Sequence, residues 1–345
     1  MAASKKWLIT GGCGFIGASL TEKLVTEGGH FIRILDNLSV GSLSDIARVC
    51  GFTETDTRPC SRHLTLSPYA ELIIGDIRDY DTCCKASEGV DIIVHLAANT
   101  GVGPSVENPR ADMESNIIGI FNMLEAAKQN RVSRFIFASS GAPVGECEPP
   151  IHEGLAPHPV SPYGASKLAG EGYCSAYFHS FGIETVALRF GNVYGPGSGH
   201  KNSVVAKFIR QAMNGETLEI YGDGNQTRDF IFIDDLSMAI MLSSDKSGIG
   251  GEIFQIAANT ETTVKKLAEK LLPILSDSGY KDVQMRYTNP RTGDVRRNFS
   301  DTSKAGKMLG WNAETRFSEG LRRTVDWFVS FNPQTQPQIS ETLQP

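Results

Sequence analysis

The sequence predicts an α/β protein built on a doubly wound parallel sheet, followed by a smaller C-terminal α/β region. Short apolar segments alternate with longer helical patterns through the first 190 residues, which is the signature of a parallel sheet with helices on both faces. Most of these segments are unbroken runs of β-branched and aromatic residues, as strands buried on both faces should be. The chain has 345 residues, 40% of them hydrophobic, which is enough for such a core.

Six strands are expected in the first half of the chain. They are Trp7–Thr10, Phe31–Leu35, Leu72–Gly75, Ile92–Leu96, Arg134–Ser139 and Glu184–Phe190. The first helix is expected at Ala18–Thr26. The polar stretch Thr53–Pro68 is interpreted as a surface insertion after the second helix, and no chemistry is assigned to it.

Beyond Gly191 the alternation of strands and helices breaks down. Helices are expected at Val204–Asn214, Val264–Leu272 and Phe317–Val329, and a strand at Gly251–Ala257 is expected to return to the first sheet. We therefore predict a cofactor-binding domain at 1–190 and a substrate-binding domain at 191–330. Residues 331–345 are polar and rich in proline and glutamine, so we expect a disordered tail.

Composition argues against several classes of function. The net charge is −6 and no run of Lys or Arg stands out, so neither a nucleic acid nor a membrane surface is an expected partner. The seven cysteines are irregularly spaced, without a C-x-x-C pair or zinc-ligand spacing, so we expect no metal and no disulfide framework. Without a signal sequence or an apolar run of about 20 residues, the expected location is the cytoplasm.

The first expected strand runs into a glycine-rich loop. Gly12, Gly14 and Gly17 fit G-x-G-x-x-G, and Gly11, Gly14 and Gly17 fit the looser G-x-x-G-x-x-G. Such a loop makes a tight turn, lets the backbone approach a diphosphate and aims a helix N-terminus at its charge. Its position between a strand and a helix predicts a Rossmann-type dinucleotide site.

Two aspartates follow expected strands. Asp36 ends the second strand, where a carboxylate can accept hydrogen bonds from the adenosine ribose and would repel a 2′-phosphate. NAD is therefore expected rather than NADP. Asp76, within Gly75-Asp76-Ile77 after the third strand, is expected to face the adenine, with a plain turn as the competing interpretation.

Tyr163 and Lys167 lie four residues apart at the opening of an expected helix and therefore share a face. A free tyrosine has a pKa of about 10 and is a poor base. A fixed cation nearby, together with a positive nicotinamide ring, stabilises the phenolate and lowers that pKa. Ser140 ends the fifth strand, at the sheet edge where doubly wound folds bind ligands. An isolated Tyr-x-x-x-Lys pair is better explained as ordinary surface residues, and Ser140 alone as a strand-end cap, but together the three residues predict a catalytic site.

These features together resemble the extended short-chain dehydrogenase/reductases, also called the NAD-dependent epimerase/dehydratase family. The resemblance covers roughly Lys6 to Trp327. Besides the residues above, it rests on His95-Leu96-Ala97-Ala98, Asn116, Ser139-Ser140, Arg189–Pro196, Arg228-Asp229-Phe230, Asp234-Asp235-Leu236 and Arg291-Thr292-Gly293-Asp294.

The resemblance implies NAD as cofactor and a nucleoside diphosphate sugar as substrate. The implied cofactor-binding residues are Gly11, Gly14, Phe15, Ile16, Gly17, Asp36, Asn37, Asp76, Ile77, Leu96, Ala97, Ala98, Asn116, Ser139, Tyr163 and Lys167. The implied substrate-binding residues are Ser140, Asn192, Ser203, Val204, Tyr221, Arg228, Arg291, Asp294 and Asn298. Among the latter, the asparagine and the two arginines suit a diphosphate, which arginine can bind bidentately.

Three reactions diverge from a 4-keto sugar: reduction from the other face, 4,6-dehydration and decarboxylation. Members of the family that resemble 4,6-dehydratases carry Asp-Glu after the catalytic threonine, and decarboxylating members usually carry a glutamate nearby. Here Gly141 and Ala142 follow Ser140 and offer no ionisable group. We therefore expect a UDP-hexose 4-epimerase in which Tyr163 takes the C4 hydroxyl proton with help from Ser140.

The sequence departs from the family pattern in two places. Pro143 and Val144 replace the usual Val and Tyr of S-S-x-x-V-Y-G, so that wall of the sugar pocket is expected to be smaller and stiffer. Asn298 stands seven residues after Arg291, where a bulky Tyr restricts some members to unsubstituted hexoses. We therefore expect that a 2-acetamido group fits.

Alternative functions are an epimerase acting on another nucleotide sugar such as UDP-glucuronate, an NAD(P)-dependent reductase, and a dinucleotide-sensing regulator without turnover. The intact Tyr163 and Lys167 argue against the regulator. The resemblance also implies a homodimer that pairs the helix near Met113–Asn130 with the helix of Tyr163. The apolar residues Ile117, Ile120, Phe121 and Leu124 are equally explained as a contact with the sheet.

Overall fold

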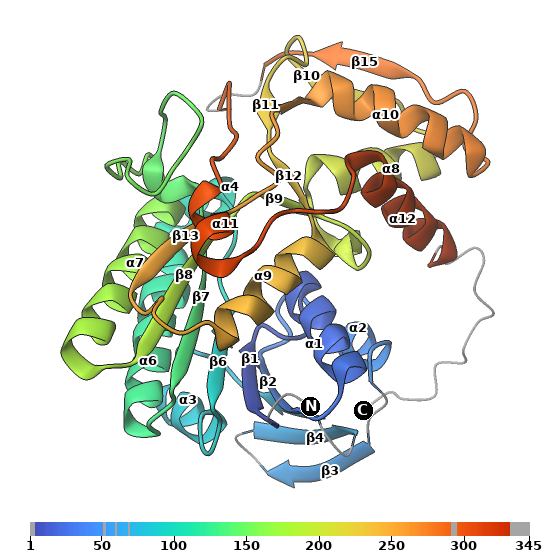
Figure 1. Cartoon of the computed structure of the whole chain (residues 1–345). Coiled ribbons are helices and arrows are strands. Elements are labelled where there is room, and N and C mark those ends of the chain that lie inside the picture. Colours follow the sequence, from blue (N-terminus) through green and yellow to red (C-terminus); the bar gives the residue numbers. More distant parts are fainter. Residues whose placement is uncertain (1–3, 51–52, 59–60, 68–69, 291–294, 332–345) are drawn as a thin grey trace.

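The main sheet of the computed structural model contains the seven strands expected to be parallel (Figure 1). The structure describes residues 4–50, 53–58, 61–67, 70–290 and 295–331. The parallel strands, in their order across the sheet, are β13 (Glu252–Ile256), β8 (Glu184–Phe190), β7 (Arg134–Ser140), β6 (Ile92–His95), β1 (Lys6–Thr10), β2 (Phe31–Asp36) and β5 (Ala70–Ile74). Each lies within two residues of its expected position, which confirms the predicted α/β fold.

The segment interpreted as a surface insertion forms a hairpin that extends this sheet. β3 (Thr53–Arg58) pairs antiparallel with β4 (Ser61–Ser67), and β4 pairs antiparallel with β5. The sequence does not predict these two strands, because the segment is polar and contains no apolar run. Polar, threonine-rich strands are nevertheless suited to the exposed edge of a sheet.

Helices cover both faces of the sheet (Figure 1). On one face lie α1 (Phe15–Glu27) and α9 (Ile233–Asp245), and on the other lie α3 (Tyr80–Ala86), α6 (Gly119–Gln129) and α7 (Pro162–Phe181). Successive strand residues point to opposite faces, so Leu8 joins one hydrophobic cluster and Ile9 joins the other. The shorter helical segments are α2 (Leu43–Ala47), α4 (Val102–Glu107), α5 (Pro109–Met113), the π-helical η1 (Glu114–Ile118) and the 3-10 helix η2 (Ala142–Val144).

The residues after β8, apart from α9 and β13, form a second region beside the carboxyl ends of the strands. Its strands pair as β9 (Asn192–Tyr194) with β12 (Phe230–Phe232), β10 (Leu218–Tyr221) with β15 (Met285–Thr288), and β11 (Thr227–Arg228) with β14 (Thr262–Thr263). Its helices are η3 (Ser198–His200), α8 (Val204–Met213), α10 (Val264–Asp277), α11 (Ser303–Leu309) and α12 (Phe317–Ser330). The expected end of α10 at Leu272 was wrong, because the helix continues through Pro273 and buries Ile274 and Leu275.

The two regions share one hydrophobic core. The cluster that contains Ile9 and Leu20 of the first region also contains Phe232 of β12 and Leu321 of α12. Of the tail expected to be disordered, all but Phe331 lies outside the described residues. In the described part of the chain, no helix has the length and hydropathy needed to cross a membrane.

Candidate active site

The loop from β1 to α1 has no room for a side chain at Gly11 or Gly17. Gly11 has φ +69°, and a Cβ there would lie 2.8 Å from the backbone nitrogen of Ala97. A Cβ on Gly17 would lie 2.5 Å from the carbonyl oxygen of Gly11. Gly14 is the N-cap of α1 and supplies no side-chain cap, and the first turn carries no acidic residue. The first-turn N–H groups therefore lack a local anion, as a diphosphate site requires.

The carboxylate of Asp36 is held against this loop. The backbone N–H groups of Cys13 and Leu38 donate to its two oxygens at 2.9 and 2.8 Å. Burial raises the pKa of Asp36, and both hydrogen bonds oppose that shift. The structure thus brings Asp36 to the glycine loop, the position in which a ribose hydroxyl can reach it.

Asn37 and Asp76 lie together at the neighbouring strand end. Asn37 Nδ2 donates to Asp76 Oδ2 at 3.0 Å, and Arg78 donates to both oxygens of that carboxylate. The hydrogen bond from Arg78 is the largest of the effects that lower the pKa of Asp76 to about 2. Asp76 also lines a pocket of about 400 Å³ together with Arg78, Asp79, Glu114 and Ile118.

A buried polar contact fixes the chain after β6. Thr10 Oγ1 lies 2.9 Å from His95 Nδ1 and accepts from the N–H of Ala97 at 3.2 Å. This contact holds Leu96, Ala97 and Ala98 against the end of β1, where the glycine loop begins. Burial lowers the pKa of His95 to about 3, and the charge of Lys167 adds to the effect.

Asn116 lies on η1 and connects two parts of the site. It accepts from the N–H of Asn99 at 2.7 Å and donates to the carbonyl of Asn99 at 2.9 Å. It also donates to Asp112 Oδ1 at 2.9 Å and contacts Ser166 Oγ at 3.2 Å, next to Lys167. Ile77 is buried, and its carbonyl accepts from Asn122 of the following helix α6.

Tyr163, Lys167 and Ser140 meet where β7 ends and α7 begins. Ser161 caps α7 through its hydroxyl and Pro162 occupies the first helical turn, which fixes the start of the helix two residues before Tyr163. Lys167 is buried, donates to the carbonyl of Ala138 at 2.9 Å and lies 5.8 Å from the centre of the Tyr163 ring.

Taken together, the protein groups around Tyr163 do not lower the pKa of its phenol. Burial raises its pKa to about 12, while the hydrogen bond with Ser140 lowers it and the charge of Asp112 raises it. Desolvation is the largest effect on this pKa, and the lowering expected from Lys167 together with a positive nicotinamide ring has to act against it. Burial also lowers the pKa of Lys167 to about 8, and the charge of Asp112 opposes that shift.

The hydroxyl of Ser139 is directed into the interior. It donates to Glu171 Oε1 at 2.6 Å, and Glu171 forms a bidentate pair with Arg189 at 2.7 and 2.8 Å. Both charged side chains are 2% exposed. This interaction joins β7, α7 and β8 beneath Tyr163 and Lys167.

Four of the expected substrate residues lie in two pairs, Arg228 with Asn298 and Ser203 with Val204. Arg228 donates to the carbonyl of Val295, and Asn298 donates through its N–H to Thr227 Oγ1 at 3.2 Å, so these two residues lie on adjacent chain segments. Ser203 is the N-cap of α8 and precedes Val204, and its hydroxyl is buried without a hydrogen-bond partner among the described residues.

The remaining expected substrate residues are placed less directly. Asn192 starts β9 and donates its N–H to the carbonyl of Asp229 at 2.8 Å. Tyr221 ends β10, and its hydroxyl and ring contact Lys207. Arg291 and Asp294 lie outside the described residues.

Sequence reasoning missed three residues near the site. Asp112 is 1% exposed, precedes Asn116 by one helical turn, and was overlooked because its surroundings are polar. Gly41 packs so closely on the glycine loop that a Cβ would lie 2.2 Å from the carbonyl oxygen of Cys13. Glu171 follows Lys167 by four residues, and this spacing was a signal that could have found it.

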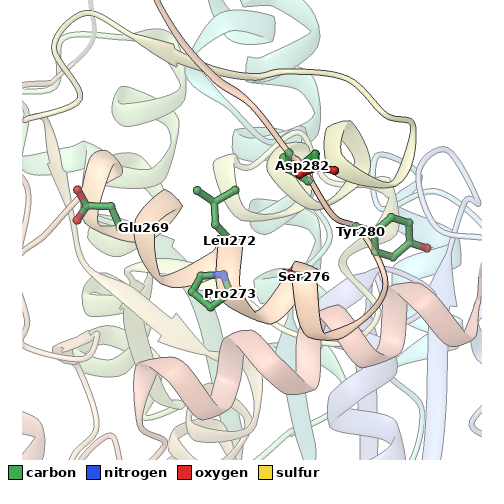
Figure 2. Close-up of a pocket in the computed structure, with 7 residues that line it drawn as sticks. Glu269, Leu272, Pro273, Ser276, Tyr280 and Asp282 are labelled. Carbon is green, nitrogen blue, oxygen red and sulfur yellow. The ribbon is translucent and has the colours of Figure 1, made fainter.

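A second pocket lies away from these residues. It measures about 450 Å³ and is lined by Glu269, Leu272, Pro273 and Ser276 of α10 and by Tyr280, Asp282 and Val283 after it (Figure 2). It contains none of the expected site residues, and no group of charged or nucleophilic side chains converges in it. We assign it no chemistry.

Known proteins are similar to this chain over nearly its whole length. The sequence pattern of the NAD dependent epimerase/dehydratase family matches residues 7–257. The UDP-glucose 4-epimerase of Mycolicibacterium smegmatis is 32% identical, over 93% of this chain and 97% of that protein.

Two solved structures are similar in fold and sequence. One is the UDP-N-acetylglucosamine 4-epimerase of Methanobrevibacter ruminantium in complex with UDP-N-acetylmuramic acid (TM-score 0.84, 31% identity, 95% of this chain and 99% of that one). The other is the UDP-glucose 4-epimerase of Thermotoga maritima with UDP-glucose (TM-score 0.83, 33% identity, 94% and 99%). The glycine loop with Asp36 fits a bound NAD, and Ser140, Tyr163 and Lys167 fit a dehydrogenase-type active site. This protein belongs to the NAD-dependent epimerase/dehydratase family.

Proposed function

We propose that this protein is a nucleotide-sugar 4-epimerase that inverts C4 of a UDP-hexose through a transient 4-keto sugar. The observation that carries the proposal is the hydrogen bond of Ser140 with Tyr163, with Lys167 beside the Tyr163 ring. Positions 141 and 142 carry no ionisable residue. A proton acceptor for the C4 hydroxyl is present at this point of the site. The acid and base that dehydration needs are absent from those two positions.

The side chains have distinct roles in this mechanism. Tyr163 accepts the C4 hydroxyl proton at its phenolic oxygen and later returns it to the C4 oxygen of the inverted sugar. Ser140 Oγ accepts from the N–H of Ala142 at 3.2 Å, which leaves its own proton free to stabilise the phenolate. The glycine loop and Asp36 would hold NAD, which would supply a hydride acceptor at C4, hydride return to the opposite face, and a positive ring that would offset the burial that raises the pKa of Tyr163.

Lys167 supplies a positive charge and a hydrogen-bond donor beside Tyr163. Because its pKa is about 8, Lys167 is protonated in most of the molecules at neutral pH. Asp112 supports that charge from behind, with its own carboxylate held by Asn116. The 4-keto sugar must rotate about its phosphate linkage while the diphosphate stays bound, and Arg228 and Asn192 are proposed to hold it. We propose residues 1–190 as the cofactor domain and 191–330 as the substrate domain.

A panel of UDP-, GDP- and dTDP-sugars tests this function, with products followed by NMR. We expect conversion of a UDP-hexose into its C4 epimer without net formation of NADH. Tyr163→Phe should lose nearly all turnover while NAD stays bound. Tyr80→Phe, whose hydroxyl donates to Gln129 at the surface, should not. Net NADH production would identify an oxidoreductase, and inversion at C5 or C2 would identify another epimerase.

Substrate breadth is proposed to depend on Asn298. A side chain smaller than Tyr leaves space for a 2-acetamido group, and Asn298 is fixed to β11 through Thr227. Asn298→Tyr should therefore lower the ratio of the activity on UDP-GlcNAc to that on UDP-glucose. An unchanged ratio would count against this role.

The proposed homodimer uses the outer faces of α6 and α7. Ile120 and Leu124 are fully buried against the sheet, whereas Ile118, Phe121 and Tyr173 are 41%, 38% and 37% exposed. Phe121 and Tyr173 also contact each other. Phe121→Glu should shift the protein to a monomer in sedimentation, and an unchanged dimer would contradict this surface. A cytoplasmic location is proposed because the cysteines in the described residues are free thiols.

A further inference from the structure

A segment of the second region, residues 195–203 between β9 and α8, packs on the glycine loop. A Cβ built on Gly197 would lie 3.4 Å from the ring of Phe15, the first residue of α1. Arg210 of α8 donates to the carbonyl of Gly199 at 2.7 Å. His200 lies 3.3 Å from Asp45 of α2. Contacts from both regions therefore fix the 195–203 segment beside the loop that holds the cofactor.

Lys201 is the one residue of this segment whose charge is not matched. Its Nζ lies 5.0 Å from the centre of the Phe15 ring and 3.4 Å from the carbonyl oxygen of Val193. No carboxylate lies within salt-bridge distance of it among the residues that the structure describes. Burial lowers the pKa of Lys201 to about 8. A half-buried ammonium that lacks a counter-ion is costly unless a ligand provides one.

The nearest site for an anion is the glycine loop itself. Phe15 starts α1, whose first turn has free N–H groups and no acidic side chain. We propose that Lys201 is a diphosphate ligand that reaches from the second region to the diphosphate of the bound NAD. The 195–203 segment then links cofactor binding to the region that holds the substrate.

The substrate offers the competing source of a diphosphate. Ser203, two residues further along, belongs to the expected substrate residues and has a buried hydroxyl without a hydrogen-bond partner in the described part of the chain. The proximity to Phe15 favours NAD, and the experiment needs one measurement for each diphosphate. The inference rests on NAD binding and is independent of the reaction proposed above.

The test compares Lys201→Met with Lys201→Arg and with Lys270→Met, which removes an exposed lysine of α10. The first measurement is the rate at which holoenzyme exchanges its NAD for etheno-NAD, followed by fluorescence. The second is a calorimetric titration of NAD-loaded protein with UDP. Melting curves establish that each variant is folded, and Lys201→Gln replaces Lys201→Met if the latter is not.

We expect Lys201→Met to exchange NAD about tenfold faster or more, the scale of one charge-assisted hydrogen bond. Lys201→Arg should stay close to the wild-type rate, Lys270→Met should match it, and UDP affinity should change by less than about twofold. Wild-type NAD exchange in Lys201→Met overturns the proposal. Weaker UDP binding together with unchanged NAD exchange overturns it as well, because Lys201 would then serve the substrate.

Discussion

Replacing Glu171 by Gln should strongly destabilise the protein, although Glu171 itself is not a catalytic residue. The pair of Glu171 and Arg189 is 2% exposed on both sides and makes hydrogen bonds of 2.7 and 2.8 Å. Arg189 already has one buried nitrogen, Nη1, without a hydrogen-bond partner among the described residues. Glutamine keeps the shape and removes the charge, so the guanidinium stays buried without an anion.

The size of the effect follows from this burial. Breaking a buried ion pair on one side costs about 3–5 kcal/mol, because the remaining charge is uncompensated. That is a large part of the about 5–15 kcal/mol that stabilises a typical protein. The free energy of unfolding can be measured by urea denaturation with NAD held in constant excess, since bound NAD itself adds stability.

Two controls decide whether charge burial is the cause. The double variant Glu171→Gln with Arg189→Met removes both charges of this pair and should recover most of the loss. Asp277→Asn breaks an exposed pair with Arg322 and should cost less than about 1 kcal/mol. A loss below about 1 kcal/mol for Glu171→Gln, or a double variant as unstable as the single one, would refute the reasoning.

Two further predictions concern the cofactor loop and its support. Gly17→Ala places a methyl group 2.5 Å from the backbone of Gly11, so the protein should be purified without NAD. Gly306→Ala, whose Cβ would lie 3.3 Å from the Asn312 side chain and 3.7 Å from the carbonyl oxygen of Trp311, should retain NAD. Equal NAD content in both variants would contradict this. The pKa of His95 is about 3 when folded and about 6.5 when unfolded, so only the unfolded chain binds its proton between these values. The free energy of unfolding should therefore fall as the pH drops below about 6.5. His95→Gln should weaken this pH dependence, measured by urea denaturation at pH 4.5–8. The same pH dependence in the variant and the wild type would contradict this.

Much of the fold and site could be predicted because the signals are local. The buried strands are apolar runs, and the glycine loop lies directly between a strand and a helix. Tyr163 and Lys167 share a helix, so their spacing alone places them together. The same reasoning located Asp36 at the end of β2, next to the loop that it contacts.

Other features depend on contacts that no short stretch of sequence encodes. Asp112 is a site residue only because α5 packs beneath α7, and its polar neighbours look like those of a surface helix. The pKa of Tyr163 depends on burial, which the sequence does not give. Lys201 meets Phe15 through a contact between residues far apart in the chain. The strands β3 and β4 pair by backbone hydrogen bonds and carry no apolar pattern.

The position of β13 has a consequence for how the protein can be made and cut. Residues 252–256 pair with residues 186–190, so the first sheet cannot be completed until the chain has been synthesised almost to residue 260. A fragment ending near residue 190 would leave β8 as an open edge, with unpaired backbone groups available to other chains. The boundary between the two regions is therefore not a place where the polypeptide can be divided. During synthesis, the edge of β8 stays open to wrong pairing while about sixty further residues emerge.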